Sequence, residues 1–166
     1  VKGYLLSAFS ANRDIFHHGG KFIISHGGGK AESVLSREGG PQTQLADDQD
    51  STDKSVRALL NTFASKNPLV LLVDDKYALF PYDLASSRYT YVVLGHFWIS
   101  HAWAEYQPAS NTRGRVVRYK FAFQWCEEQG PPWWIPKTDE DNCTPPTNTR
   151  FVLQHASKVY IPQTVH

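Results

Sequence analysis

The clearest hydrophobic pattern along the chain is a strict alternation over residues 115–125. The sequence RVVRYKFAFQW places apolar or aromatic side chains on one face: Val117, Tyr119, Phe121, Phe123 and Trp125. The alternate positions carry Val116, Arg118, Lys120, Ala122 and Gln124. Because successive side chains of a strand point to opposite faces, the pattern predicts a strand with one face in the core. Its other face, with two cations, is predicted to meet water or a polyanion.

Five further segments have the period or composition of a regular element. Residues 4–9 and 21–25 are short and apolar and predict strands. The run PLVLLV at 68–73 predicts a strand buried on both faces, and the aromatic and β-branched residues of 88–103 predict a longer strand. A helix over about 52–66 is predicted by apolar residues at i, i+3, i+4 and i+7: Val56, Leu59, Leu60 and Phe63.

The segments between these elements are polar or rich in glycine and proline. Residues 30–50 show no sustained period and contain Gly39, Gly40 and Pro41, so we predict an exposed loop. The chain from Pro131 onward holds six of the ten prolines and is predicted to wrap over the surface. Strands outnumber helices and do not alternate with them. This favours an α+β, mainly β fold: a twisted, barrel-like sheet with one or two helices.

Composition places the chain among globular domains. Its 166 residues are 41% hydrophobic and 20% charged, and its formal net charge of +1 leaves room only for a local basic patch. Cys126 and Cys143 lie in a chain without a signal-peptide pattern, so free thiols in a reducing compartment are expected. No apolar run approaches the roughly 20 residues of a membrane span. The chain begins at Val1 and has no methionine, so we expect it to be part of a larger multidomain protein.

The stretch NRDIFHHGGKFIISHGGGK, residues 12–30, combines five glycines, three histidines and one acid. Glycines let a backbone approach a ligand closely, so the candidate ligands are a phosphate, a metal and a base. SHGGGK lacks the GxxxxGK[ST] spacing of a nucleotide-binding loop. His17, His18 and His26 lack metal-ligand spacing, and neither the cysteines nor the serines lie in a nucleophile motif. A phosphate and a metal are therefore disfavoured, and no cofactor is expected.

A series of motifs along residues 4–135 supports a base as the ligand. RDIFHHGGKFIISHGGGK at 13–30 is followed by Asp48-Gln49, Arg57-Ala58-Leu59 and Pro68-Leu69-Val70. RYTYVVLGHFWISHAW at 88–103 and RYKFAFQWCEEQGPPWW at 118–134 complete the series. In this order the motifs resemble the SRA (SET and RING associated, also called YDG) domain, a PUA-like family that flips 5-methylcytosine out of DNA.

The resemblance implies a fold, a function and a partner. The fold would be a twisted SRA-type β-barrel over residues 1–135, with 136–166 as a C-terminal extension packed on the same domain. The function would be that of a non-enzymatic reader, which recognises 5-methylcytosine or an oxidised form in duplex DNA by base flipping. The partner would be duplex DNA carrying a modified base, in the nucleus of a eukaryote or otherwise in the cytoplasm, without a membrane.

The resemblance also assigns a base pocket residue by residue. Asp14 corresponds to the acid that accepts a hydrogen bond from the cytosine amine, and Ser25 to the hydroxyl residue that helps to hold the base. The glycines that follow would allow close approach of the backbone: Gly27, Gly28 and Gly29. Asn12 and Ile24 occupy the positions of the family's two stacking tyrosines. The candidates to replace those rings are Phe9, Phe16 and His26.

DNA contacts outside the pocket are assigned to five cations. Arg37, in the loop over 30–50, would fill the gap that the flipped base leaves in the duplex. The densest basic run of the chain would bind phosphates: Arg113, Arg115, Arg118 and Lys120.

Two functions of other classes fit parts of the same pattern. An enzyme would use His17, His18 or His26 as acid–base or metal-binding groups in the glycine-lined pocket. A PUA-like RNA-binding module would stack single-stranded bases on tryptophan and tyrosine rings. The enzyme interpretation predicts bound metal or catalytic activity. The RNA-binding interpretation predicts a preference for single strands, whereas the SRA interpretation predicts a preference for duplex DNA.

Overall fold

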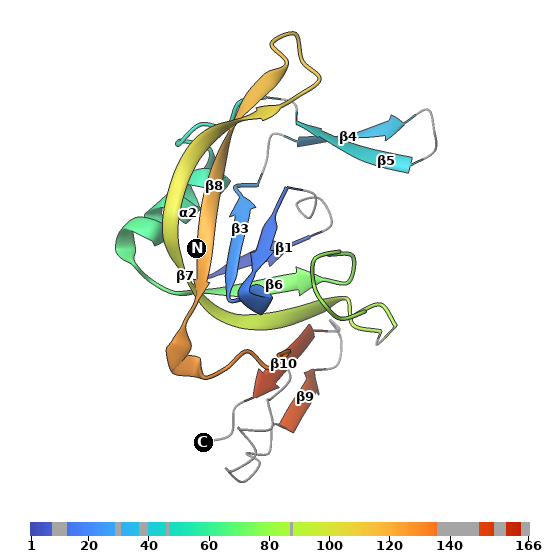
Figure 1. Ribbon diagram of the computed structural model, residues 1–166, viewed down its shortest axis with the longest axis vertical. Helices are drawn as coiled ribbons and strands as arrows, with labels where there is room; N and C mark the ends of the chain where they lie inside the picture. The colour runs from blue at the N-terminus through green and yellow to red at the C-terminus, as the bar shows by residue number, and fades with distance from the viewer. Residues whose placement is uncertain are drawn as a thin grey trace.

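The computed structural model describes residues 1–7, 13–28, 31–36, 40–45, 47–86, 88–135, 150–154 and 159–163. Its main feature is an eight-stranded sheet that curls into half a barrel (Figure 1). Six strands lie in the order β1 (Gly3–Leu6), β6 (Leu69–Asp74), β7 (Tyr91–Pro108), β8 (Arg115–Trp125), β3 (Phe22–His26) and β2 (Ile15–His17). β10 (Val159–Gln163) pairs with β7 and with β9 (Arg150–Gln154). All the pairs are antiparallel except β1 with β6 and β10 with β7.

The curvature of the sheet depends on β7, the long strand that sweeps around the molecule in Figure 1. Its register shifts opposite Leu71/Leu72 and again between Ile99 and His101, and such bulges bend a strand and increase its twist. Gly95, at φ +147°, lies at the first shift. A Cβ there would lie 2.8 Å from the Trp125 ring, so glycine lets β7 bend around that side chain.

The core lies between the sheet and α2 (Lys54–Ser65), which packs against β7 (Figure 1). The helix buries Val56 and Leu59 from its predicted apolar stripe. It ends where Lys66 adopts a left-handed conformation, φ 52°, two residues before Pro68. From the sheet, the fully buried side chains include Leu6, Ile23, Leu71, Phe97, Phe121 and Phe123.

Aromatic residues from two loops complete the core. Trp134 is 2% exposed and packs edge-on against Trp125, with ring centroids 5.4 Å apart. Its indole Nε1 donates to the carbonyl of Gly19 at 2.6 Å. The hydroxyl of Tyr82 donates to the backbone carbonyl of Trp134. Phe80 lies 6.1 Å from the same ring. The segment 131–135 therefore ties the end of β8 to the β2–β3 turn and to the loop before β7.

The fold class and most predicted elements are confirmed. Strands are present at 3–6, 22–26, 69–74, 91–108 and 115–125, and α2 is the only α-helix in the part of the chain that is described. Buried and half-exposed residues alternate along β6, so the prediction that it is buried on both faces is wrong. That prediction failed because β6 keeps one face toward the core while the other is only partly covered.

The prediction of a loop over 30–50 is also wrong. β4 (Ala31–Ser36) and β5 (Gly40–Leu45) pair in register from Ala31↔Leu45 to Ser36↔Gly40 and form a separate hairpin that projects from the sheet (Figure 1). Ladder hydrogen bonds hold such a hairpin without the apolar alternation that marks a half-buried strand. In the C-terminal segment, β10 pairs with β7 at Val159↔Tyr91, but the division into 1–135 and 136–166 stays a prediction.

Candidate nucleic-acid interface

The cationic face of β8 is turned inward. Arg118 is 0% exposed and Lys120 is 5% exposed, so the prediction that this face meets water or a polyanion is wrong. Because the sheet curls, both faces of β8 are covered. Opposite Arg118 in the register stands Glu105 of β7, and opposite Lys120 stands His26 of β3. We call Arg13, Asp14, His26, Glu105, Arg118 and Lys120 the polar face.

The polar face concentrates positive charge. The pKa of Arg118 is lowered to about 10, mainly by burial and also by the nearby Arg13, while Asp47, Asp48 and Asp53 oppose the shift. The pKa of Lys120 is also lowered by burial, and its Nζ donates to the carbonyl of Arg13 at 2.6 Å. Arg13 therefore lies close enough to Arg118 and to Lys120 to lower the pKa of each.

Glu105 is the acid of β7 on this face. Burial raises its pKa, but hydrogen bonds from Gln107 and Trp103, at 2.9 and 2.8 Å, outweigh burial and leave the pKa lowered. The carboxylate therefore stays ionised and offsets part of the charge of Lys120.

Asp14 lies at the end of the polar face, with its side chain fully buried. The hydroxyl of Tyr77 donates to its Oδ2 at 3.1 Å. Burial and the neighbouring Asp14 raise the pKa of Tyr77, so the phenol keeps its proton and acts as a donor. Asp14 Oδ1 lies 3.6 Å from His26 Nδ1. On its other side, His26 Nε2 lies 3.1 Å from an Arg13 nitrogen.

Ser25, predicted to hold a base, is directed into the core. Its Oγ lies 2.8 Å from the Tyr4 hydroxyl, which in turn donates to the carbonyl of His26 at 2.6 Å. The single phenolic hydrogen is used on that carbonyl, so the hydroxyl of Ser25 is the donor to Tyr4. This contact ties β3 to β1. Contact between Ser25 and a base stays a prediction.

The turn after β3 is held by Gln49, whose role was not predicted from the sequence. Its Nε2 donates to the carbonyls of Gly27 and Gly28 at 2.5 and 3.0 Å, and its Oε1 accepts from the backbone N–H of Tyr119 at 2.9 Å. Ser55 also donates to the Gly28 carbonyl, at 2.6 Å. The motif Asp48-Gln49 was the available signal for this role.

The two described glycines of the turn differ in their surroundings. A Cβ at Gly27 would lie 3.0 Å from Val56, so this glycine allows close packing on α2. A Cβ at Gly28 would find its nearest neighbour, Ser55, at 4.0 Å. Gly29 and Arg37 lie outside the described residues, as do Phe9 and Asn12. Phe16 packs on Tyr77 with ring centroids 6.4 Å apart, and its stacking on a base stays a prediction.

Two cations of the predicted phosphate-binding set are exposed, at the end of the β7–β8 hairpin. Arg113 pairs with Asp48 at 2.9 Å, and their side chains are 59% and 38% exposed. The Asp48 carboxylate also accepts from the backbone N–H of Val117 at 2.8 Å. Arg115 lies over the ring of Tyr106 at 4.3 Å, and Tyr106 is 65% exposed. Of the residues predicted to contact phosphates, Arg113 and Arg115 are the ones that a duplex can reach directly.

Comparisons with known proteins bear on the fold. No family model matches the chain, and no curated protein does. The SRA domain of SUVH5 in complex with fully methylated CG DNA matches with a TM-score of 0.50 and 18% identity, over 82% of this chain and 69% of that one. The same domain bound to fully hydroxymethylated CG DNA matches at 0.50 and 17%, over 81% and 69%. The modification-dependent TagI restriction endonuclease matches at 0.58 and 17%, over 77% and 39%. The chain has the SRA fold.

Within this SRA fold, His17 and His26 of the enzyme alternative lie far apart. His17 pairs with Phe22 at the start of β3, whereas His26 ends that strand four residues later, roughly 13 Å away at about 3.3 Å per residue. In the described part of the chain, no three metal-binding side chains gather. Burial raises the pKa of Cys126 to about 11, so its thiol stays protonated. The geometry therefore gives no support to a combined histidine site.

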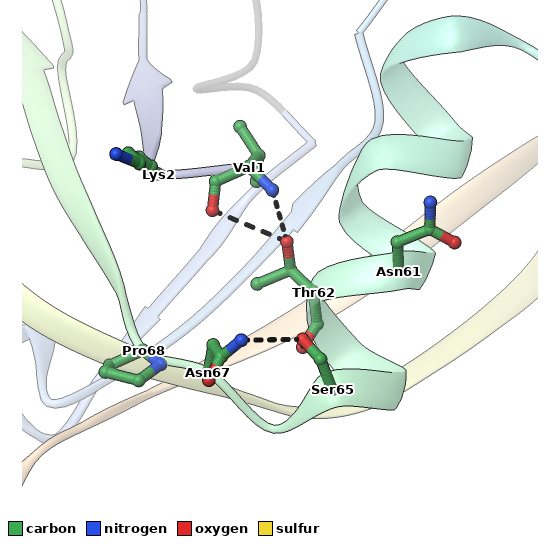
Figure 2. Close-up of a pocket in the computed structure, with 7 residues that line it drawn as sticks. All are labelled: Val1, Lys2, Asn61, Thr62, Ser65, Asn67 and Pro68. Carbon is green, nitrogen blue, oxygen red and sulfur yellow. Dashed lines mark hydrogen bonds between the residues drawn. The ribbon is translucent and has the colours of Figure 1, made fainter.

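This structure also has a pocket between the start of the chain and the end of α2 (Figure 2). Its lining consists of Val1, Lys2, Asn61, Thr62, Ser65, Asn67 and Pro68. The polar groups there bond to one another, as Asn67 does to Ser65 at 3.2 Å, and the lining includes no aromatic ring (Figure 2). It shares no residue with the polar face. Among the described residues, no helix has the length and apolar character to cross a membrane.

Proposed function

We propose that this chain is a non-enzymatic DNA reader domain that binds duplex DNA, everts one modified cytosine and holds its edge against Asp14. The SRA fold supports the proposal, because SRA domains with this fold are found in complex with methylated and hydroxymethylated CG DNA. The main observation in its support is the burial and hydrogen bonding of the Asp14 side chain. Its carboxylate is buried and positioned by Tyr77, and a carboxylate is the acceptor that a cytosine amine requires.

The positive charge around Asp14 favours a polyanion as the ligand. Arg13, Arg118 and Lys120 on the polar face produce a positive potential around the proposed pocket. At the β7–β8 hairpin, Arg113 and Arg115 are exposed and able to contact phosphates. Removing a base from the stack costs a few kcal/mol, and contacts to phosphates and to the everted base offset that cost.

Chemistry on the base is not part of the proposal. His17, on β2, pairs with the first residue of β3 while His26 is the last, and the Cys126 thiol is protonated. The likeness to a restriction endonuclease covers 39% of that chain, so nuclease activity is not transferred to this one. We propose that any catalysis associated with this domain would come from another part of a larger protein.

The test is equilibrium binding at one fixed salt concentration to duplexes that differ only in a central cytosine, 5-methylcytosine or 5-hydroxymethylcytosine. We expect at least tenfold tighter binding to one modified duplex, about 1.4 kcal/mol. A 2-aminopurine next to the target base reports eversion, because its fluorescence rises when its neighbour leaves the stack. Equal binding to all duplexes would reduce the function to general DNA binding. Preference for a single-stranded control would favour the RNA-binding alternative.

A further inference from the structure

Two buried polar atoms face each other across the site. Asp14 Oδ1 and His26 Nδ1 lie 3.6 Å apart, beyond the usual length of a hydrogen bond, and neither has a closer partner among the described residues. Their side chains are 0% and 10% exposed. A buried donor or acceptor without a partner costs free energy, so such atoms in a folded protein require an explanation. A ligand that satisfies both atoms provides one.

The contact with Arg13 fixes the hydrogen on His26. An Arg13 nitrogen lies 3.1 Å from Nε2, and a guanidinium only donates, so Nε2 accepts and the hydrogen lies on Nδ1. The neutral ring agrees with the lowered pKa of His26, which is caused mainly by burial. The pair therefore presents one acceptor, Asp14 Oδ1, beside one donor, His26 Nδ1–H.

The edge of cytosine has the complementary arrangement. Its exocyclic amine donates and its ring nitrogen N3 accepts. The amine nitrogen and N3 are bonded to the same ring carbon. With C–N bonds of about 1.33 Å, these two nitrogens lie about 2.3 Å apart. That spacing is narrower than the 3.6 Å between the protein atoms, so a base that arrives edge-on can contact both. Thymine presents the reverse order, an acceptor beside N3–H.

We infer that His26 is a specificity-determining residue, which donates its Nδ1–H to N3 of an everted cytosine while Asp14 Oδ1 accepts from the exocyclic amine. This inference rests on the proposed function. Because both atoms are buried, neighbouring groups move aside when the base arrives. Adenine has the same order of amine and ring nitrogen on its edge, so the test includes it.

The test uses duplexes in which the central base stands opposite an abasic site, so that unpairing costs are equal. The central bases are 5-methylcytosine, its analogue with N3 replaced by CH, thymine and adenine. The wild-type protein is expected to bind the CH analogue about tenfold more weakly than 5-methylcytosine, and thymine more weakly still. His26→Leu is expected to bind 5-methylcytosine and the CH analogue equally. His26→Asn keeps an N–H donor near the position of Nδ1 and is expected to recover part of the difference.

The outcomes separate this inference from the proposed function. If the CH analogue binds the wild-type protein within twofold of 5-methylcytosine, His26 does not read N3, although a preference for modified duplexes would still stand. An equal loss in wild type and His26→Leu would overturn the inference in the same way. If adenine binds as tightly as 5-methylcytosine, the assignment to cytosine is overturned. No duplex binding above the single-stranded control would overturn both. The wild-type comparison needs no variant, so it can overturn the inference even if a variant fails to fold.

Discussion

Asp14 is the residue on which the proposed site depends. Replacement by alanine removes the only acceptor proposed for the cytosine amine. We expect Asp14→Ala to weaken binding of the preferred duplex by about 1–3 kcal/mol and to abolish the preference. Tyr77→Phe is the matched control, since it removes the 3.1 Å hydrogen bond to Oδ2 but leaves Oδ1 in place. That variant is expected to lose stability and keep the order of preference. If Asp14→Ala retains the preference, the pocket assignment is wrong.

The two glycines of the turn after β3 allow a second test at single residues. A methyl group at Gly27 would press on Val56, whereas one at Gly28 would make only an ordinary van der Waals contact with Ser55, at 4.0 Å. We expect Gly27→Ala to lower the free energy of unfolding by about 1–3 kcal/mol, as overpacking does, and Gly28→Ala to change it little. Urea unfolding of both variants measures the difference. Equal stabilities would mean that Val56 and its neighbours relax freely around the added methyl group.

The buried His26 predicts a pH dependence of stability. Its pKa is lowered in the folded state, so the unfolded chain binds a proton at a higher pH, near the ordinary value of about 6.5. Between those two values the unfolded state holds more protons, and stability therefore falls as the pH drops through about 6.5. We expect the free energy of unfolding to decrease from pH 7.5 to 5.5, and less steeply in His26→Asn. Identical slopes would show that another group is responsible.

Local motifs in the sequence mark Asp14, His26 and the glycines as candidate site residues, and their contact with a base stays a prediction. The sequence did not show which residues position them, since these are distant along the chain. Tyr77 is 63 residues from Asp14, and Gln49 is 70 residues from its partner Tyr119. Such contacts exist only after the sheet has formed, so a motif such as Asp48-Gln49 marks a residue but not its partner.

At the scale of the element, β8 shows what alternation can and cannot predict. The period of two predicted its limits, Arg115–Trp125, correctly. It gave the wrong surroundings for Arg118 and Lys120, because the rule that a charged face is a solvent face assumes an open sheet. In a curled sheet both faces are covered, and the charges are placed beside Arg13, Asp14 and Glu105.

This difference changes the expected roles of two arginines on one strand. Arg115 is exposed and Arg118 is 0% exposed. We expect Arg115→Ala to weaken binding to every duplex and to reduce the slope of log affinity against log salt by about 1. Arg118→Met, which removes a charge that does not reach a phosphate, is expected to leave the slope unchanged. Binding titrations between 50 and 200 mM salt measure both, and equal changes in slope would place Arg118 against DNA.

At the scale of the whole molecule, contacts between residues distant in sequence stabilise the half-barrel. The indoles of Trp133 and Trp134 donate to the carbonyls of Val93 and Gly19, which lie on β7 and in the β2–β3 turn. The segment that carries them was predicted to wrap over the surface because of its prolines. Trp134 is instead part of the core, since burial of so large a ring outweighs the irregular backbone around it.

The position of Trp134 allows a direct test of the predicted boundary at residue 135. A chain that ends at residue 135 keeps both indoles, and one that ends at residue 130 loses them. Removal of a buried tryptophan costs about 3–5 kcal/mol, a large part of the stability of a domain. We therefore expect residues 1–135 to unfold cooperatively on heating. Residues 1–130 are expected to have a much lower Tm or no cooperative transition.

Both truncations also remove β10, whose pairing with β7 covers Tyr91 and Val92 in the described residues. Loss of that short pairing is expected to lower Tm by a few degrees, and Trp134→Ala in the full chain serves as the control for the indole. If residues 1–135 fail to fold while the full chain does, the segment 136–166 belongs to the domain itself. The boundary would then lie beyond β10, and the sheet would depend on its C-terminal strands.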